Sequence, residues 1–365
     1  MPLFNKKQSY VGIDIGTSSI KAVELFDEGG RPKLVTYGFI EQPTEIIKSD
    51  SDEALQQMVV NIKSVLKKAK VSSKKIISAL PSFAVFNSIL SLPVMPKKDL
   101  YSAVRWEAKK IVPMSIDEMV LDWRVLRDPS EIENEKKEKK FKKPKIESDI
   151  QGPKNLKILI TAAPKNLVKR YIDIFKLAEL EIVSLETESF AVVRSLLGND
   201  QSAVMIIDIG AIATEISVIL DGFPFLNRSI DVGGDTITKS IANGLNIDLE
   251  RAEQIKRDFG VLTEAGTSQI PKVIEFVMNN IVNEIRYILS LYQSQGERPI
   301  EKIILSGGSA FLPNLSDYLE KTVQLKSFIG DPWSRVIYPV ELKPVLDELG
   351  PRFSVAIGLA MREIV

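Results

Sequence analysis

The chain has 365 residues with 48 acidic and 48 basic side chains, so its net charge is zero and no whole-molecule field favours nucleic acid. It contains neither cysteine nor histidine, which excludes disulfides, thiolate zinc sites, cysteine nucleophiles and Ser-His-Asp triads. Any chemistry must therefore use carboxylates, lysines, hydroxyls or a bound metal, and the length suits two or three domains.

No part of the sequence has the pattern of a targeting or membrane segment. Residues 1–7 lack the apolar core of a secretory signal, and no apolar run approaches the roughly 20 residues of a membrane-spanning helix. We therefore expect a cytoplasmic protein.

The first 80 residues predict strands followed by a helix and one more strand. Residues 9–41 read as three strands, with turns at 16–18 and 27–30. A helix is expected from Ser51 or Asp52 to about Lys70, because apolar residues recur there every three and four positions. A short buried strand follows at 76–80.

Residues 81–155 read as an inserted small α+β subdomain. Prolines break the pattern around a strand near 85–92, and a helix over 99–111 and a strand over 119–126 follow. Residues 127–155 are dense in lysine and glutamate, which predicts a solvated, disordered loop. A basic contact with anionic lipid or with an acidic partner is the alternative interpretation of that segment.

The rest of the chain returns to alternating strands and helices. Strands are expected at 156–162, 203–209, 214–220, 225–230 and 303–306. Helices are expected at 165–178, 188–197, 235–244, 248–259, about 269–295 and from about 352. Each half thus begins with a strand meander and ends in helices, which indicates a duplicated α/β architecture with a cleft between its halves.

Two segments far apart in the chain look like copies of one hairpin. The runs Ile13-Asp14-Ile15-Gly16 and Ile207-Asp208-Ile209-Gly210 each end an apolar strand in Asp-x-Gly, and small residues follow. Glycine and small residues let backbone N–H groups approach phosphate oxygens, and a carboxylate there can hold a cation through water. One such motif is usually a plain turn, but its repetition favours two hairpins that clasp a polyphosphate with Mg²⁺.

Further motifs have both a structural and a binding interpretation. Gly307-Gly308 follows a buried strand, and Gly233-Gly234 joins another strand to a helix, so either pair could be a tight turn or a place where a ligand packs on the backbone. Glu253 and Lys256 lie three positions apart on one helix face. Their spacing alone favours a surface ion pair over contact with a ribose.

The order of these motifs resembles the actin-like ATPase superfamily over nearly the whole chain. The run from Val232-Gly233-Gly234-Asp235 to Asp258-Phe259-Gly260 is similar to the branch that contains FtsA and PilM. Leu92-Pro93-Val94-Met95-Pro96, Trp106-Glu107-Ala108 and Ile111-Val112-Pro113 resemble the inserted subdomain of PilM, the type IV pilus assembly family. FtsA proteins usually carry a C-terminal membrane helix, which this sequence does not show.

The resemblance implies a duplicated actin-like (ribonuclease H-like) ATPase fold. Its first half would comprise 1–80, 156–199 and 345–365, and its second half 200–344, with the insertion at 81–155.

The resemblance also implies roles for individual residues in binding ATP and Mg²⁺. Asp14 and Asp208 would hold Mg²⁺ through water and, with Glu188, which positions the attacking water, form the catalytic set. The residues that would bind the phosphates are Gly16, Thr17, Ser18 and Ser19 on one side and Gly210 and Ala211 on the other. Glu253 and Lys256 would hold the ribose, Gly307, Gly308 and Ser309 would flank adenine, and Gly233 and Gly234 complete the nucleotide-binding set.

One departure from strong ATPases of the superfamily lies in the second hairpin, Gly210-Ala211-Ile212-Ala213-Thr214, which is poor in glycine. Its Cβ atoms should loosen the phosphate cradle, so we expect nucleotide binding with slow or absent hydrolysis.

The function implied by the resemblance is an ATP-binding scaffold at the inner face of the cytoplasmic membrane, in a type IV pilus or related type II secretion apparatus. Its partner would be the cytoplasmic N-terminal tail of a PilN-like membrane protein, with room for self-association and no nucleic acid. The alternative is an FtsA-like protein that forms ATP-dependent filaments. A sugar or acetate kinase of the same superfamily is disfavoured, because no base remains for a second substrate.

Overall fold

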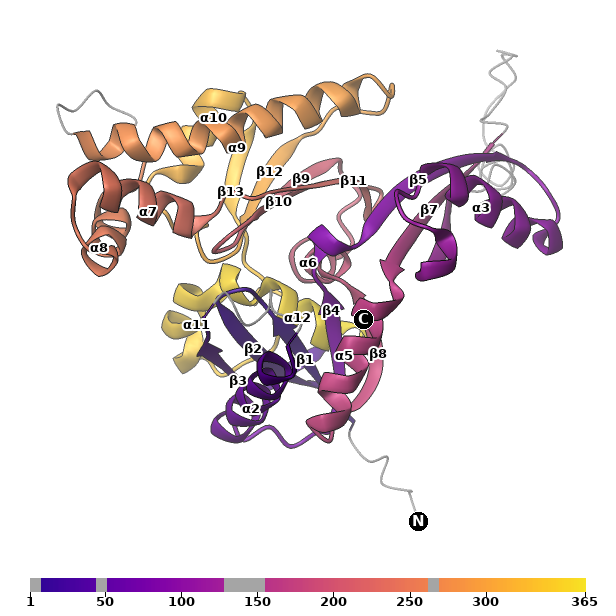
Figure 1. Ribbon diagram of the computed structural model, residues 1–365, viewed down its shortest axis with the longest axis horizontal. Coiled ribbons are helices and arrows are strands. Elements are labelled where there is room, and N and C mark those ends of the chain that lie inside the picture. Colours follow the sequence, from indigo (N-terminus) through magenta and orange to yellow (C-terminus); the bar gives the residue numbers. More distant parts are fainter. Residues whose placement is uncertain (1–7, 44–50, 128–154, 262–268) are drawn as a thin grey trace, which may run out of the picture. The chain divides into compact units, whose positions relative to one another are not determined.

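The computed structural model describes residues 8–43, 51–127, 155–261 and 269–365 (Figure 1). The chain divides into two compact units, one of Met1–Phe83 with Arg170–Val365 and the other of Ala84–Lys169. The larger unit is built on two five-stranded sheets, and the smaller unit on a three-stranded sheet.

The two sheets of the larger unit share one topology. Their strand orders are β3-β2-β1-β4-β8 and β11-β10-β9-β12-β13, each an antiparallel meander extended by two parallel strands. The first sheet comprises β1 (Ser9–Ile15), β2 (Ser19–Asp27), β3 (Pro32–Glu41), β4 (Lys75–Leu80) and β8 (Glu181–Thr187). The second comprises β9 (Val204–Ile209), β10 (Thr214–Leu220), β11 (Phe223–Ile230), β12 (Lys302–Ser306) and β13 (Lys326–Ile329). The duplication expected from the sequence is therefore present strand by strand.

The helices are as follows. They are α2 (Asp52–Lys68), α3 (Lys97–Ile111), α5 (Lys165–Leu177), α6 (Glu188–Leu196), α7 (Gly234–Leu245), α8 (Leu249–Phe259), α9 (Gln269–Gln293), α10 (Leu315–Val323), α11 (Lys343–Leu349) and α12 (Ser354–Met361). The α2 helix begins where the sequence predicts, because the Ser51 hydroxyl accepts a hydrogen bond from the Ala54 N–H.

Helices α6 and α12 pack against both sheets of the larger unit (Figure 1). Ala191 of α6 and Leu359 of α12 share one core with Ile77 of β4 and Ile206 of β9. The two helices touch closely at Gly358, where a Cβ atom would lie 1.8 Å from the Ala191 carbonyl oxygen. These two helices are therefore the packed connection between the two halves of the larger unit.

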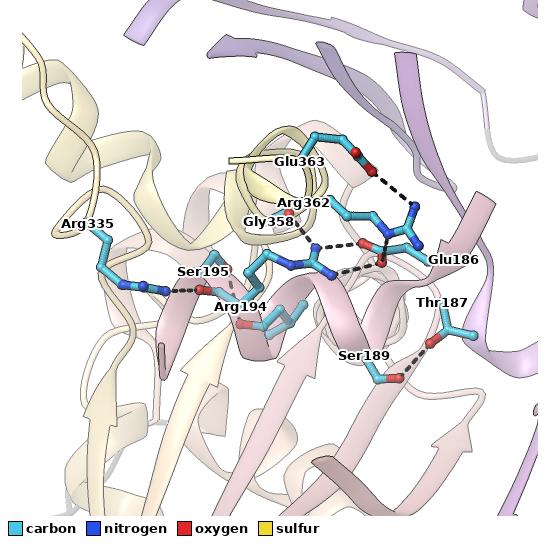
Figure 2. A network of polar contacts seen from close by, with 10 residues as sticks. Glu186, Thr187, Ser189, Arg194, Ser195, Arg335, Gly358, Arg362 and Glu363 are labelled. Atoms are coloured by element: carbon cyan, nitrogen blue, oxygen red, sulfur yellow. Dashed lines mark hydrogen bonds and ion pairs between the residues drawn. The ribbon is translucent and has the colours of Figure 1, made fainter. Parts of the chain in front are cut away.

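A network of arginines and carboxylates joins β8, α6 and α12 (Figure 2). Arg194 donates to both oxygens of Glu186, at 2.7 and 2.9 Å, and to the Gly358 carbonyl oxygen at 2.6 Å. The Arg362 guanidinium lies 3.1 Å from the same Glu186 carboxylate. Two cations thus share one mostly buried anion, which is an arrangement that fixes orientation.

The smaller unit has its own core. Its sheet has the order β5-β7-β6, built from β5 (Phe86–Pro93), β6 (Met119–Arg127) and β7 (Asn155–Pro164). Val104 and Ala108 of α3 pack with Ile158 and Ile160 of β7. The smaller unit includes β7, most of which the family resemblance places in the first half of the fold. The domain ranges expected from the sequence remain a prediction.

The predicted elements agree with the structure apart from a few differences. The helix expected at Asp99 begins at Lys97, directly after Pro96, and the last helix begins at Ser354 after a 3₁₀ turn over Gly350–Phe353. Strands β8 and β13 and helix α11 were not predicted, because each is short and carries polar residues among its apolar ones.

The lysine- and glutamate-rich segment expected to form a loop is shorter than predicted at both ends. Arg127 and Asn155 belong to strands β6 and β7, and the rest of the segment lies outside the described residues. Within the described residues, none of the helices combines the length and the apolar character needed to cross a bilayer.

Candidate functional site

A cavity of about 1120 Å³ lies in the larger unit and brings both Asp-x-Gly hairpins together. Almost all of the predicted site residues line it. They are Asp14, Gly16, Thr17, Ser18, Ser19, Glu188, Asp208, Gly210, Ala211, Gly234, Glu253, Lys256, Gly307, Gly308 and Ser309. Gly233 is not among the lining residues. It packs behind the hairpin, where a Cβ atom would lie 2.5 Å from the Ala211 carbonyl oxygen.

The two hairpins turn in the same way. The Gly16 N–H donates to the Ser19 carbonyl oxygen at 3.0 Å, and the Gly210 N–H donates to the Ala213 carbonyl oxygen at 2.9 Å. Each turn therefore leaves the small residues between those two positions at the cavity wall. Backbone N–H groups in such a turn are suited to an anionic ligand.

The second hairpin is held in place by its neighbours. The N–H groups of Gly234 and Asp235 donate to the carbonyl oxygens of Gly210 and Ala211, at 3.0 and 2.8 Å. The Ser309 N–H donates to the Ile209 carbonyl oxygen at 3.1 Å. Gly234 and the residues that follow the two glycine pairs, Asp235 and Ser309, thus hold this hairpin in place.

Gly307 allows the loop after β12 to approach the end of β9 more closely than a residue with a side chain would permit. Its φ is +86°, and a Cβ atom there would lie 2.5 Å from the Ile209 carbonyl oxygen and 2.7 Å from Asp208 Oδ1. The glycine therefore lets the loop after β12 lie directly against the end of β9, where Asp208 is placed.

Four carboxylates concentrate negative charge in the cavity. Burial raises the pKa of Asp208 from 3.8 to about 6, and that of Glu215 from 4.5 to about 7. Burial first, and then the charges of Glu215 and Asp14, raise the pKa of Glu188 well above its ordinary value. Raised values of this kind indicate carboxylates whose charged forms are disfavoured, first by burial and then by neighbouring carboxylates.

A hydrated cation fits this set of residues. The described residues contain no group of three or more acidic side chains arranged to coordinate a metal directly. The carboxylates line one cavity, where burial and neighbouring charges raise the pKa values of Glu188 and Asp208, and a bound cation would favour their charged forms. The observed arrangement is thus compatible with Mg²⁺ held through water, the mode expected from the sequence.

Glu253 and Lys256 form an ion pair at the wall of the cavity. Lys256 Nζ lies 2.6 Å from Glu253 Oε2, so the ion pair favoured by spacing alone is present. Both side chains also line the cavity, and both contact the Thr238 hydroxyl, at 2.6 Å from Glu253 and 3.0 Å from Lys256. The pair is therefore placed where it could also contact a ligand.

The cavity residues that the sequence analysis did not identify include four with polar or charged side chains: Lys21, Ser82, Glu215 and Arg352. The hairpin register could have revealed two of them, because Lys21 pairs opposite Asp14 and Glu215 pairs opposite Asp208 at the same offset. Lys21 Nζ lies 2.8 Å from Asp14 Oδ2. Ser82 and Arg352 come from segments without a recognisable motif.

Comparisons with known proteins agree with this fold and site. The family model of the type IV pilus assembly protein PilM matches residues 12–364. A solved PilM-PilN type IV pilus biogenesis complex contains a chain that is 26% identical, with a TM-score of 0.81 and 98% of both chains covered.

More distant relatives carry less information. The cell division protein FtsA of Bacillus subtilis is 24% identical over 365 aligned positions, which cover 90% of this chain and 80% of that protein. MreB5 of Spiroplasma citri bound to AMPPNP is 14% identical with a TM-score of 0.53, covering 96% of this chain and 94% of that one, and supports the fold alone. The actin-like ATPase fold predicted from the sequence is confirmed. The chain belongs to the type IV pilus assembly protein PilM family.

Proposed function

We propose that this protein binds ATP with Mg²⁺ in the cavity of its larger unit and works as a scaffold of a type IV pilus inner-membrane complex. The observation that carries the proposal is the meeting of both Asp-x-Gly hairpins, with Asp14 and Asp208, at one cavity. The AMPPNP bound to MreB5, a protein of the same fold, adds support.

In this proposal the first hairpin and the second hairpin bind phosphate oxygens from opposite sides through backbone N–H groups, aided by the hydroxyls of Thr17, Ser18 and Ser19. Asp14 and Asp208 hold the cation through water. A bound Mg²⁺ supplies positive charge that offsets the phosphates and the carboxylates together. Lys21, paired with Asp14, lies ready to contact phosphate once that carboxylate faces a cation.

The remaining residues would position the nucleoside and the attacking water. Glu253 and Lys256 contact the ribose, and Gly307, Gly308 and Ser309 lie against adenine. Glu188 orients water toward the phosphates. Slow or absent hydrolysis is expected because the second hairpin, from Gly210 to Thr214, is poor in glycine and its Cβ atoms loosen the phosphate cradle.

The proposed partner is the cytoplasmic N-terminal tail of a PilN-like membrane protein, which would recruit this chain to the inner face of the membrane. Support comes from the solved PilM-PilN complex, whose matching chain is covered over 98% of its length. The smaller unit offers exposed apolar side chains for protein contact, including Tyr101 at 59% and Trp106 at 66% exposure.

Isothermal titration of the purified chain tests the proposal. Mg·ATP and a peptide that copies the PilN-like tail are titrated separately and then together, with Mg²⁺ alone as the control. We expect both ligands to bind, and the change in affinity for one caused by the other measures how the nucleotide regulates assembly. No heat and no thermal shift with Mg·ATP would refute nucleotide binding, and no peptide binding would refute the partner.

The match to FtsA over 90% of this chain favours a second candidate, a filament that forms with ATP. Sedimentation with and without Mg·ATP separates the two. Pelleting that depends on the nucleotide would support the filament, and a chain that stays in the supernatant while binding the peptide would support the scaffold.

A further inference from the structure

Ser82 carries a buried hydroxyl that makes no hydrogen bond within the described part of the chain. The residue is 8% exposed and begins a 3₁₀ turn, Ser82–Ala84, directly after Pro81 and strand β4. Among the described buried side-chain atoms without a hydrogen-bond partner, that of Ser82 alone belongs to a residue lining the cavity. A buried hydroxyl without a partner is unfavourable, so such an atom in a binding site calls for an explanation.

The backbone of Ser82 already holds one of the site carboxylates. The Ser82 N–H donates to Glu188 Oε2 at 2.9 Å. This is a charge-assisted contact between the end of β4 and the start of α6, and it points the Glu188 carboxylate at the cavity.

The Ser82 side chain faces a second carboxylate, on the other sheet. Its hydroxyl lies near enough to lower the pKa of Glu215, and the charge of Glu215 raises the pKa of Glu188. Glu215 is held from its own side, since Asn227 Nδ2 donates to it at 2.7 Å. Ser82 therefore lies between Glu188, to which its N–H donates, and Glu215, which its hydroxyl approaches without forming a hydrogen bond.

We propose that Ser82 is a positioning residue of the nucleotide site, whose N–H fixes Glu188 and whose hydroxyl donates to Glu215 once a ligand fills the cavity. The new hydrogen bond joins the turn after β4 of the first sheet to β10 of the second sheet, so the bound ligand is linked to a contact between the two halves. Ser82 lies two positions before Ala84, where the smaller unit begins. This inference rests on the proposed binding of Mg·ATP.

Two alanine variants, at Ser82 and at Ser78 four positions earlier, test the proposed role of the Ser82 hydroxyl. Ser82→Ala removes the hydroxyl without a partner. Ser78→Ala, in the same segment, removes a buried hydroxyl that donates to the Ile13 carbonyl oxygen at 2.7 Å. Thermal unfolding of the ligand-free chain and titration with Mg·ATP are measured for both and for the wild type.

The two variants should behave in opposite ways. Ser82→Ala should leave the ligand-free melting temperature unchanged or higher, because no hydrogen bond is lost, and should weaken Mg·ATP binding about fivefold to tenfold. Ser78→Ala should lower the ligand-free melting temperature and leave the affinity for Mg·ATP within about twofold. A Ser82→Ala chain that melts early and binds Mg·ATP like the wild type would overturn the proposal, because its hydroxyl would then be purely structural.

A second pair covers the case in which Ser82→Ala does not fold. Ser82→Thr keeps the hydroxyl and Ser82→Val has the same shape without it, so Thr should bind Mg·ATP about as tightly as the wild type and Val should not. Equal affinities for the two variants overturn the proposal. A wild-type chain that does not bind Mg·ATP removes the proposed function and this inference with it, whereas binding by the wild type and by every Ser82 variant alike removes this inference alone.

Discussion

Lys21 Nζ and Asp14 Oδ2 form a 2.8 Å ion pair across strands β1 and β2, and both side chains are largely buried, at 12% and 7% exposure. The pair places one cation beside the carboxylate expected to hold Mg²⁺. In the ligand-free chain Lys21 neutralises Asp14. In the proposed complex with Mg²⁺ and phosphate, each side chain would have a partner of its own, so the pair would link the charge of the site to its ligand.

Removing Asp14 should therefore affect stability and binding in separable ways. Asp14→Ala leaves Lys21 without its partner, and we expect the free energy of unfolding to fall by about 3 kcal/mol while the chain stays folded. The double variant Asp14→Ala with Lys21→Met removes the buried charge and should recover most of that loss. Both variants should lose Mg·ATP binding by calorimetry. Near wild-type affinity in the double variant would show that Asp14 is not part of the cation site.

Stability of the ligand-free chain should depend on pH because of the cavity carboxylates. The pKa values of Asp208 and Glu215 are raised in the folded chain to about 6 and about 7, above their values of 3.8 and 4.5 in the unfolded chain. The folded chain therefore holds more protons between about pH 4 and 7, and the free energy of unfolding must fall as pH rises through that window. We expect denaturant titrations without Mg²⁺ to show lower stability at pH 8 than at pH 5.5.

Glu215→Gln checks which group is responsible. Glutamine cannot ionise, so the decrease between pH 5.5 and 8 should shrink by an amount on the order of 2 kcal/mol. Glu179→Gln is the matched control, because the Glu179 carboxylate is exposed and the ion pair with Lys63 lowers its pKa. The same pH slope in the Glu215→Gln chain and the wild type would contradict the assignment.

Alanine substitutions at Gly307 and Gly308, after β12, should affect stability and ATP binding differently. Gly307→Ala places a Cβ atom 2.5 Å from the Ile209 carbonyl oxygen at a φ of +86°, and should lower the free energy of unfolding by about 2 kcal/mol. Gly308→Ala meets nothing closer than 3.8 Å, so its stability should stay near that of the wild type. Because Gly308 lines the cavity, its new methyl group should still weaken ATP binding. Equal stability of the two variants in urea would contradict this division.

The sequence could reveal the hairpins because their chemistry is local. Asp14 and Gly16, like Asp208 and Gly210, lie within a few residues of each other at the end of an apolar strand, so one short pattern contains both the carboxylate and the turn. The strand meanders follow from the same local alternation. The repeat predicted both the duplicated topology and the meeting of the two aspartates at one cavity.

The rest of the site depends on contacts between distant segments. Ser82 reaches Glu188 from more than a hundred positions away in the chain, and no local pattern marks either residue as a partner of the other. Arg352 enters the cavity from a turn that precedes the last helix. Strand β13 is short and half of its residues are polar, so its place beside β12 depends on tertiary pairing.

Glu186 should be among the costly charges to remove, because its carboxylate is shared by two guanidinium groups (Figure 2). It is 10% exposed and lies two positions before Glu188, at the junction of β8 and α6. Glu186→Gln keeps the shape but leaves Arg194 without its counter-charge, and we expect the free energy of unfolding to fall by about 3 kcal/mol. Glu363→Gln breaks a longer, more exposed pair with Arg362, 3.6 Å long, and should cost less than about 0.5 kcal/mol. Equal urea midpoints for the two variants would show that the network does not hold α6 and α12 together.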